Sequence, residues 1–171
     1  ASCSPTPHVA GQLGFSTFGM GYTSDAVDSE EETLFVANAS GLGSIDDNWV
    51  VSEVGAISGA PELTGNATGG LWGFFPKSSD GMTQPHISRI DKSNAALSET
   101  SELPAIAGWR GNYAFAHWGG DFYVFFGQTS LSDTNVYRVD PDTGVMEDWL
   151  LDSGRYILGA GVSTCAPIII E

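Results

Sequence analysis

The feature that most constrains the fold of this chain is a hairpin pattern that recurs along it. In "YRVDPDTGVMEDW" (137–149) two alternating runs flank a turn, in which Pro141 fixes φ and Gly144 permits a positive φ. The segments "SRIDKSNAALSET" (88–100) and "GSIDDNWVVSEV" (43–54) have the same layout. Each hairpin carries an aspartate directly after an apolar residue, at intervals of about 45 to 50 residues, namely Asp46, Asp91 and Asp140. The chain is therefore predicted to be a repeat protein.

The elements that precede each hairpin keep the same phase. Strands rich in small residues are expected at 18–25, 63–70, 113–120 and 158–165. Apolar, aromatic runs follow the first three of them, "LFVANA", "LWGFFP" and "FYVFFG". Such continuous apolar runs are typical of strands that are buried on both faces. We predict three complete four-stranded units (about 16–60, 61–107 and 108–154) and the first strand of a fourth (155–165).

A four-stranded unit of this length is typical of a β-propeller blade. The chain resembles the propeller superfamily with kelch-like or quinoprotein-like repeats, in which an aspartate-containing turn joins the two outer strands. The resemblance spans roughly residues 14–165 and implies an all-β, propeller-like single domain over residues 1–171. On this fold Trp49, Trp72 and Trp149 are expected to pack between neighbouring units. An evenly spaced β-sandwich is the alternative.

A second resemblance concerns the two ends of the chain. The ending "GAGVSTCAP", taken with "GFSTFGMGYTSD" and "ETLFVA" near the start, resembles a domain of bacterial cell-envelope lipoproteins. That resemblance implies a secreted, periplasmic or cell-surface setting and no particular activity.

Three blades and one strand do not easily close a ring, because propellers have about four blades or more. The N-terminal segment 7–15 could pair with the last strand, with a Cys3–Cys165 disulfide locking the seam. A second chain could instead complete the ring, making a homo-oligomer through the open blade edge. The chain could also be part of a longer protein. For the cysteines, two unrelated thiols or an acylated Cys3 are the alternatives to a disulfide.

The charge balance limits the classes of partner. With 21 acidic and 6 basic residues, the formal net charge is −15. Such a field repels nucleic acid and anionic membranes, and no apolar run is long enough for membrane insertion. We expect Asp46, Asp91 and Asp140 to accept turn amides. The acidic run "DAVDSEEE" is either solvated charge or a calcium site with Asp25, Asp28, Glu30 and Glu31 as ligands. No other cofactor is expected.

No familiar catalytic motif occurs, neither a Gly-x-Ser-x-Gly elbow nor a phosphate-binding loop nor a zinc signature. The leading hypothesis is a non-catalytic binding or assembly domain. The alternatives are a hydrolase or lyase that uses carboxylates at an axial funnel, and a self-assembling structural subunit.

The scarce arginines indicate a candidate ligand face. Two of them lie in the connections between the last strand of one unit and the first strand of the next. Aromatic and amide side chains lie there too, and together they would suit a glycan, a peptide or a protein ligand. The face comprises Trp109, Arg110, Asn112, Arg155 and Tyr156. The alternative is that each arginine pairs with an acidic residue of the adjacent unit.

Overall fold

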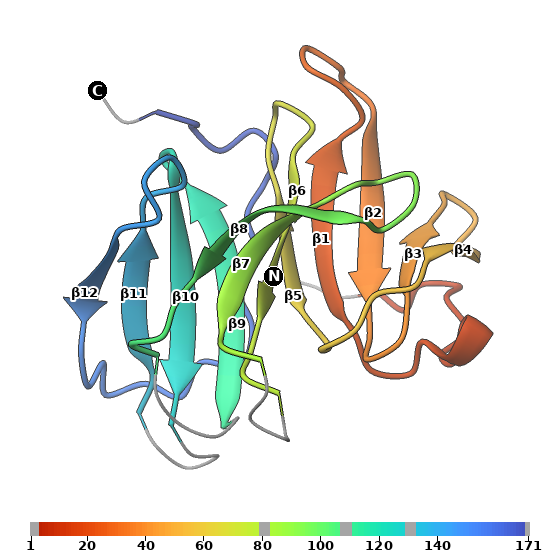
Figure 1. Cartoon of the computed structure of the whole chain (residues 1–171). Coiled ribbons are helices and arrows are strands. Elements are labelled where there is room, and N and C mark those ends of the chain that lie inside the picture. Colours follow the sequence, from red (N-terminus) through yellow and green to blue (C-terminus); the bar gives the residue numbers. More distant parts are fainter. Residues whose placement is uncertain (1–3, 79–82, 107–110, 129–132, 170–171) are drawn as a thin grey trace.

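The protein is all-β, with three four-stranded antiparallel sheets (Figure 1). The computed structural model describes residues 4–78, 83–106, 111–128 and 133–169. In these ranges a short 3-10 helix, η1 (Gln12–Gly14), precedes the strands, and no helix has the length and apolarity that crossing a membrane requires.

The strands of the first sheet are β1 (Gly19–Ser24), β2 (Glu32–Ala37), β3 (Leu42–Ile45) and β4 (Val51–Gly55). Those of the second are β5 (Glu62–Gly65), β6 (Leu71–Phe75), β7 (His86–Ile90) and β8 (Leu97–Glu102). Those of the third are β9 (Asn112–Trp118), β10 (Asp121–Gly127), β11 (Asn135–Val139) and β12 (Met146–Leu150).

Each sheet is a simple meander in which strands pair in sequence order. This confirms the three predicted four-stranded units. The repeated aspartates accept the amides of the outer hairpin turns, as expected. Asp46 accepts the amides of Asn48 and Val50, Asp91 accepts that of Ser93, and Asp140 accepts those of Asp142 and Thr143, at 2.8–2.9 Å.

The two faces of each sheet have distinct neighbours. We call the face of the first and second sheets that packs on the following sheet the forward face, and the opposite one the rear face. In the third sheet the same names are given to the faces at equivalent ladder positions. The forward faces carry, at equivalent ladder positions, Phe35, Ala37 and Leu42 in the first sheet, Trp72, Phe74 and Ile87 in the second, and Tyr123, Phe125 and Val136 in the third. Because side chains alternate along a strand, the apolar runs supply both faces at once.

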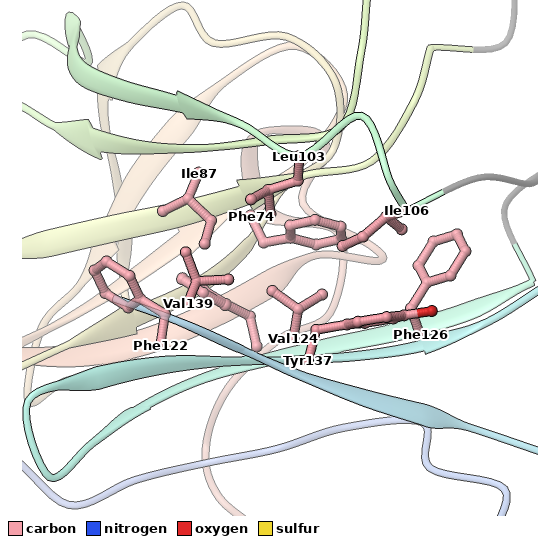
Figure 2. Close-up of a cluster of buried hydrophobic side chains, with 10 residues drawn as sticks. Phe74, Ile87, Leu103, Ile106, Phe122, Val124, Phe126, Tyr137 and Val139 are labelled. Carbon is pink, nitrogen blue, oxygen red and sulfur yellow. The ribbon is translucent and has the colours of Figure 1, made fainter. Parts of the chain in front are cut away.

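Two apolar cores lie between the sheets. The forward face of the first sheet packs on Leu71, Phe75 and Ile90 of the second. The forward face of the second packs on Phe122, Val124 and Val139 of the third, with Phe74 fully buried (Figure 2). Trp72 and Phe122 have their ring centroids 5.0 Å apart, so Trp72 packs between units as predicted.

The first strands of the three sheets lie next to one another, because small residues let their backbones approach. A Cβ on Gly65 of β5 would collide with the carbonyl oxygen of Tyr22 and with Thr23 of β1. The amide of His117 in β9 donates to the Thr64 hydroxyl of β5 at 3.0 Å. The small-residue pattern of the sequence thus reflects direct contact between β1, β5 and β9.

The N-terminal segment covers the rear face of the first sheet. Phe15, only 3% exposed, packs with Leu34, Val36, Ile45 and Val51. The Gln12 side chain bonds the carbonyl of Trp49 and the amide of Val51, at 2.8 and 3.1 Å. The segment therefore caps β3 and β4; within the described residues it forms no strand ladder with residues 158–165.

The predicted strand at 158–165 is wrong as secondary structure. Residues 155–163 have no turn or bend, yet they belong to no ladder. The Asn112 side chain donates to the carbonyl of Ile157, and the amide of Ile157 donates to the Thr134 hydroxyl. The amide of Gly119 donates to the carbonyl of Pro167. The segment therefore runs beside β9 without forming a strand ladder with it. The segment forms no strand because no described strand lies beside it to supply the backbone hydrogen bonds of a ladder. The three sheets are not closed into a ring.

Candidate functional site

A hollow lies between the strands β1, β2 and β5 and the C-terminal segment. It has a volume of about 210 Å³ and is bounded by β1, β2, β5 and residues 160–162. Its lining is Met20, Gly21, Tyr22, Leu34, Leu63, Thr64, Gly65, Ala160, Gly161 and Val162. We call it the central groove.

Strand alternation presents two side chains to the central groove. Gly19 and Gly21 face β5, where a Cβ would meet the backbone of residues 61–64. Met20 and Tyr22 therefore point the other way, toward residues 160–162, and are 56% and 47% exposed. An exposed thioether and an exposed phenol offer apolar contact together with one hydrogen-bonding group.

The chain beside the groove offers unpaired backbone. The backbone N–H and C=O groups of residues 158–162 make no hydrogen bond to any other described residue. Gly159 and Gly161 have open space where a side chain would lie. The ends of the segment are nevertheless fixed, by Ile157 at one end and by the bond of Thr164 to Glu32 at the other. Such a segment can accept an extended peptide as a neighbouring strand.

The predicted ligand face is only partly within the described residues. Trp109 and Arg110 lie outside them. Asn112 is buried and donates to the Thr134 hydroxyl and the Ile157 carbonyl, at 2.9 and 2.7 Å, so its side chain ties the C-terminal segment to β9.

Arg155 and Tyr156 are both exposed and lie next to this contact, since the Arg155 carbonyl accepts the amide of Thr134. In the described part of the chain Arg155 forms no ion pair. The side-chain ion pairs there involve other arginines, namely Arg89 with Glu99 and Arg138 with Asp121 and Glu147. The structure thus places Asn112, Arg155 and Tyr156 close together, with Asn112 in a structural role.

The acidic residues proposed as calcium ligands share the β1–β2 loop and are largely exposed. The Asp25 carboxylate accepts a hydrogen bond from the Thr33 hydroxyl at 2.7 Å, and the backbone amide of Glu31 donates one to the Ser29 hydroxyl. Within the described ranges no three His, Cys, Asp or Glu side chains gather closely enough to hold a metal ion.

Of the two cysteines, Cys165 is exposed and carries no disulfide in the described part of the chain, while Cys3 lies outside it. The predicted pairing stays a prediction.

Glu62 is a carboxyl that sequence reasoning missed. It stands opposite Phe74 in the β5–β6 ladder, and burial raises its pKa from 4.5 to about 7. Within the described ranges the Glu62 carboxyl forms no ion pair and no side-chain hydrogen bond to a nucleophile or to a second carboxylate. A glutamate inside a small-residue strand could have drawn attention to it.

Comparison of the chain with protein-family models, with curated proteins and with solved structures finds no match.

Proposed function

We propose that this chain is a non-catalytic binding domain of propeller-like architecture, which takes an extended peptide bearing an apolar side chain at the central groove. The observation that carries the proposal is the backbone of residues 158–162, which bonds to no other residue that the structure describes and lies beside exposed Met20 and Tyr22. Main-chain hydrogen bonds would give affinity, and the groove would give selectivity for one side chain.

The propeller-like arrangement is supported by the order of contacts between the units. The sheets stack forward face on rear face, and β1, β5 and β9 adjoin one another in turn. In a propeller-like arrangement residues 157–165 would take the place of the first strand of a fourth blade, which is supported by their contacts with Asn112 of β9, with Glu32 of β2 and with the groove beside β1. The acidic composition is consistent with a secreted, periplasmic or cell-surface location.

The test is a screen of immobilised peptides and glycans with the whole chain, followed by two matched variants. Tyr22 and Tyr156 are 47% and 49% exposed, one in the central groove and one on the face predicted from the sequence. We expect Tyr22→Ala to weaken peptide binding about tenfold, whereas Tyr156→Ala leaves it unchanged.

Each other outcome rejects the proposal in a different way. Binding that depends on Tyr156 and Arg155 would move the ligand site to the predicted face. Binding of glycans alone would replace the ligand class, and absence of any ligand in the screen would reject a binding function at the groove.

The hydrolase or lyase alternative has one residue to test, because the raised pKa of Glu62 would suit a general acid. Any activity found must be lost in Glu62→Gln if this alternative is correct.

A further inference from the structure

A polar hollow lies beside the central groove on the rear face of the first sheet. Leu34 lines the groove, and its ladder partner Ile45 lines this second hollow, which has a volume of about 260 Å³. The rest of its lining is Glu32, Thr33, Ser44, Asp46 and Asp47. We call it the acidic hollow. Because Glu32 and Leu34 are two residues apart on β2, their side chains project from the same face of the sheet.

The carboxylates of the acidic hollow have no cationic partner in the described part of the chain. Glu32, Asp46 and Asp47 take part in none of the side-chain ion pairs there. Lys92 approaches the neighbouring end of β1, but its ammonium donates to two backbone carbonyls, both at 2.9 Å. With a formal charge of −15 on the chain as a whole, these carboxylates favour a cation that a ligand supplies.

The arrangement of the acidic hollow indicates which kind of cation it suits. In the described ranges no three acidic side chains are close enough together to hold a metal ion. Asp46 binds the turn amides through Oδ1, so its Oδ2 is available to another donor. A hollow with separated carboxylates fits a larger organic cation with several N–H donors, such as the guanidinium of arginine or the ammonium of lysine.

The spacing between the central groove and the acidic hollow matches the repeat of an extended peptide. Leu34 and Glu32 are about 7 Å apart along β2, which is the length of two residues in a strand. The C-terminal segment follows the same axis, because residues 160–162 line the groove beside Tyr22 and Thr164 bonds Glu32. A peptide strand beside residues 158–162 therefore places one side chain in the groove and the second one along at Glu32, while the residue between them points away.

We infer that the peptide bound at the central groove carries an arginine or lysine two positions from its apolar residue, with that basic side chain in the acidic hollow. The inference rests on the proposed peptide-binding function and adds the charge and the spacing of the ligand. The negative field of the chain also speeds the encounter with such a peptide, and salt weakens this effect.

The experiment is fluorescence polarisation of the whole chain with labelled threonine peptides that contain one leucine, methionine or phenylalanine, at low and physiological salt. A second residue, either arginine, threonine or glutamate, is placed one or two positions from the apolar residue on either side. We expect arginine two positions away, on one of the two sides, to bind about tenfold more tightly than threonine. Arginine one position away should give little of this gain, because it points away from the acidic hollow.

Two hollow variants, Glu32→Gln and Asp47→Asn, each remove one charge and are expected to reduce the tenfold preference to about threefold or less. Glutamine can still accept the Thr164 hydroxyl, so the C-terminal segment stays anchored. The matched control is Glu102→Gln, which removes the same charge at an exposed position of β8 in the second sheet. A second control is Trp149→Ala. Trp149 is 55% exposed, which contradicts the expectation that it packs between units, and its ring offers another contact for an apolar, cationic peptide.

A preference for arginine that falls in at least one hollow variant and persists in both controls supports the inference. Binding that depends on Tyr22 but is equal for arginine, threonine and glutamate overturns the inference and leaves the proposed function in place. A preference that survives both hollow variants, or that falls equally in Glu102→Gln or in Trp149→Ala, overturns it as well. If no peptide shows binding that depends on Tyr22, the inference and the proposed function are both wrong.

Discussion

Replacing Glu62 by glutamine should stabilise the protein at neutral and alkaline pH. Glu62 lies on β5 opposite fully buried Phe74, and burial raises its pKa from 4.5 to about 7. An acid whose folded-state pKa is raised favours folding when it is protonated, and that contribution is lost as the pH rises from 4.5 through about 7. Above this window the wild-type chain therefore carries a half-buried, ionised carboxylate.

The size of the effect follows from the displacement of the pKa. From 4.5 to about 7 it corresponds to about 3 kcal/mol, at about 1.4 kcal/mol per pH unit. Partial solvent access lowers this, so we expect Glu62→Gln to gain about 1–3 kcal/mol of unfolding free energy at about pH 8. Well below pH 4.5 the gain should vanish, because the wild-type carboxyl is then protonated in both the folded and the unfolded chain.

The assay is urea unfolding followed by tryptophan fluorescence at several pH values between these limits. Glu53→Gln is the matched control, since Glu53 is exposed on β4 and the same charge is removed there. If the gain of Glu62→Gln does not grow with pH beyond that of Glu53→Gln, the burial argument for Glu62 is wrong.

Two further predictions test the repeat architecture. Gly65→Ala should cost about 1–3 kcal/mol or more in urea unfolding, because its Cβ would collide with the β1 backbone; Gly159→Ala, with open space around it, should cost far less. Asp140→Ala should lower the melting temperature at neutral pH, and the difference should shrink in acid. Hydrogen bonds from the turn hold the pKa of Asp140 below 3.8, so its contribution is lost as the pH falls through that lowered pKa; an equal loss in Asp142→Ala would argue against a turn-specific role.

The strands and their order could be predicted because they depend on short-range pattern. The apolar run 122–126 is buried on one face and half-buried on the other, and the aspartate turns at Asp46, Asp91 and Asp140 recur with their hydrogen bonds in place. The strands rich in small residues were predicted as well, and in the structure the glycines of β1 and β5 permit close backbone contact because they carry no side chain.

Only part of the candidate site could be predicted from patterns that are local in the sequence. The sequence predicts Asn112 as a ligand residue but does not predict that its side chain is buried and bonded to Ile157, because nothing local shows which segment passes beside β9. The environment of Glu62 was also missed, since burial depends on neighbours that are distant in sequence.

The amino-acid sequence by itself determined the four-stranded units, their turns and the apolar character of both sheet faces, because alternation and turn chemistry act within a few residues. Only the tertiary structure decided what each face meets: the N-terminal segment lies on part of the first sheet, a C-terminal segment runs beside β9 without forming a ladder with a described strand, and no further described sheet covers the forward face of the third sheet. The physical reason is that covering a face or pairing an edge requires a partner from elsewhere in space, and a local pattern carries no record of whether that partner is present.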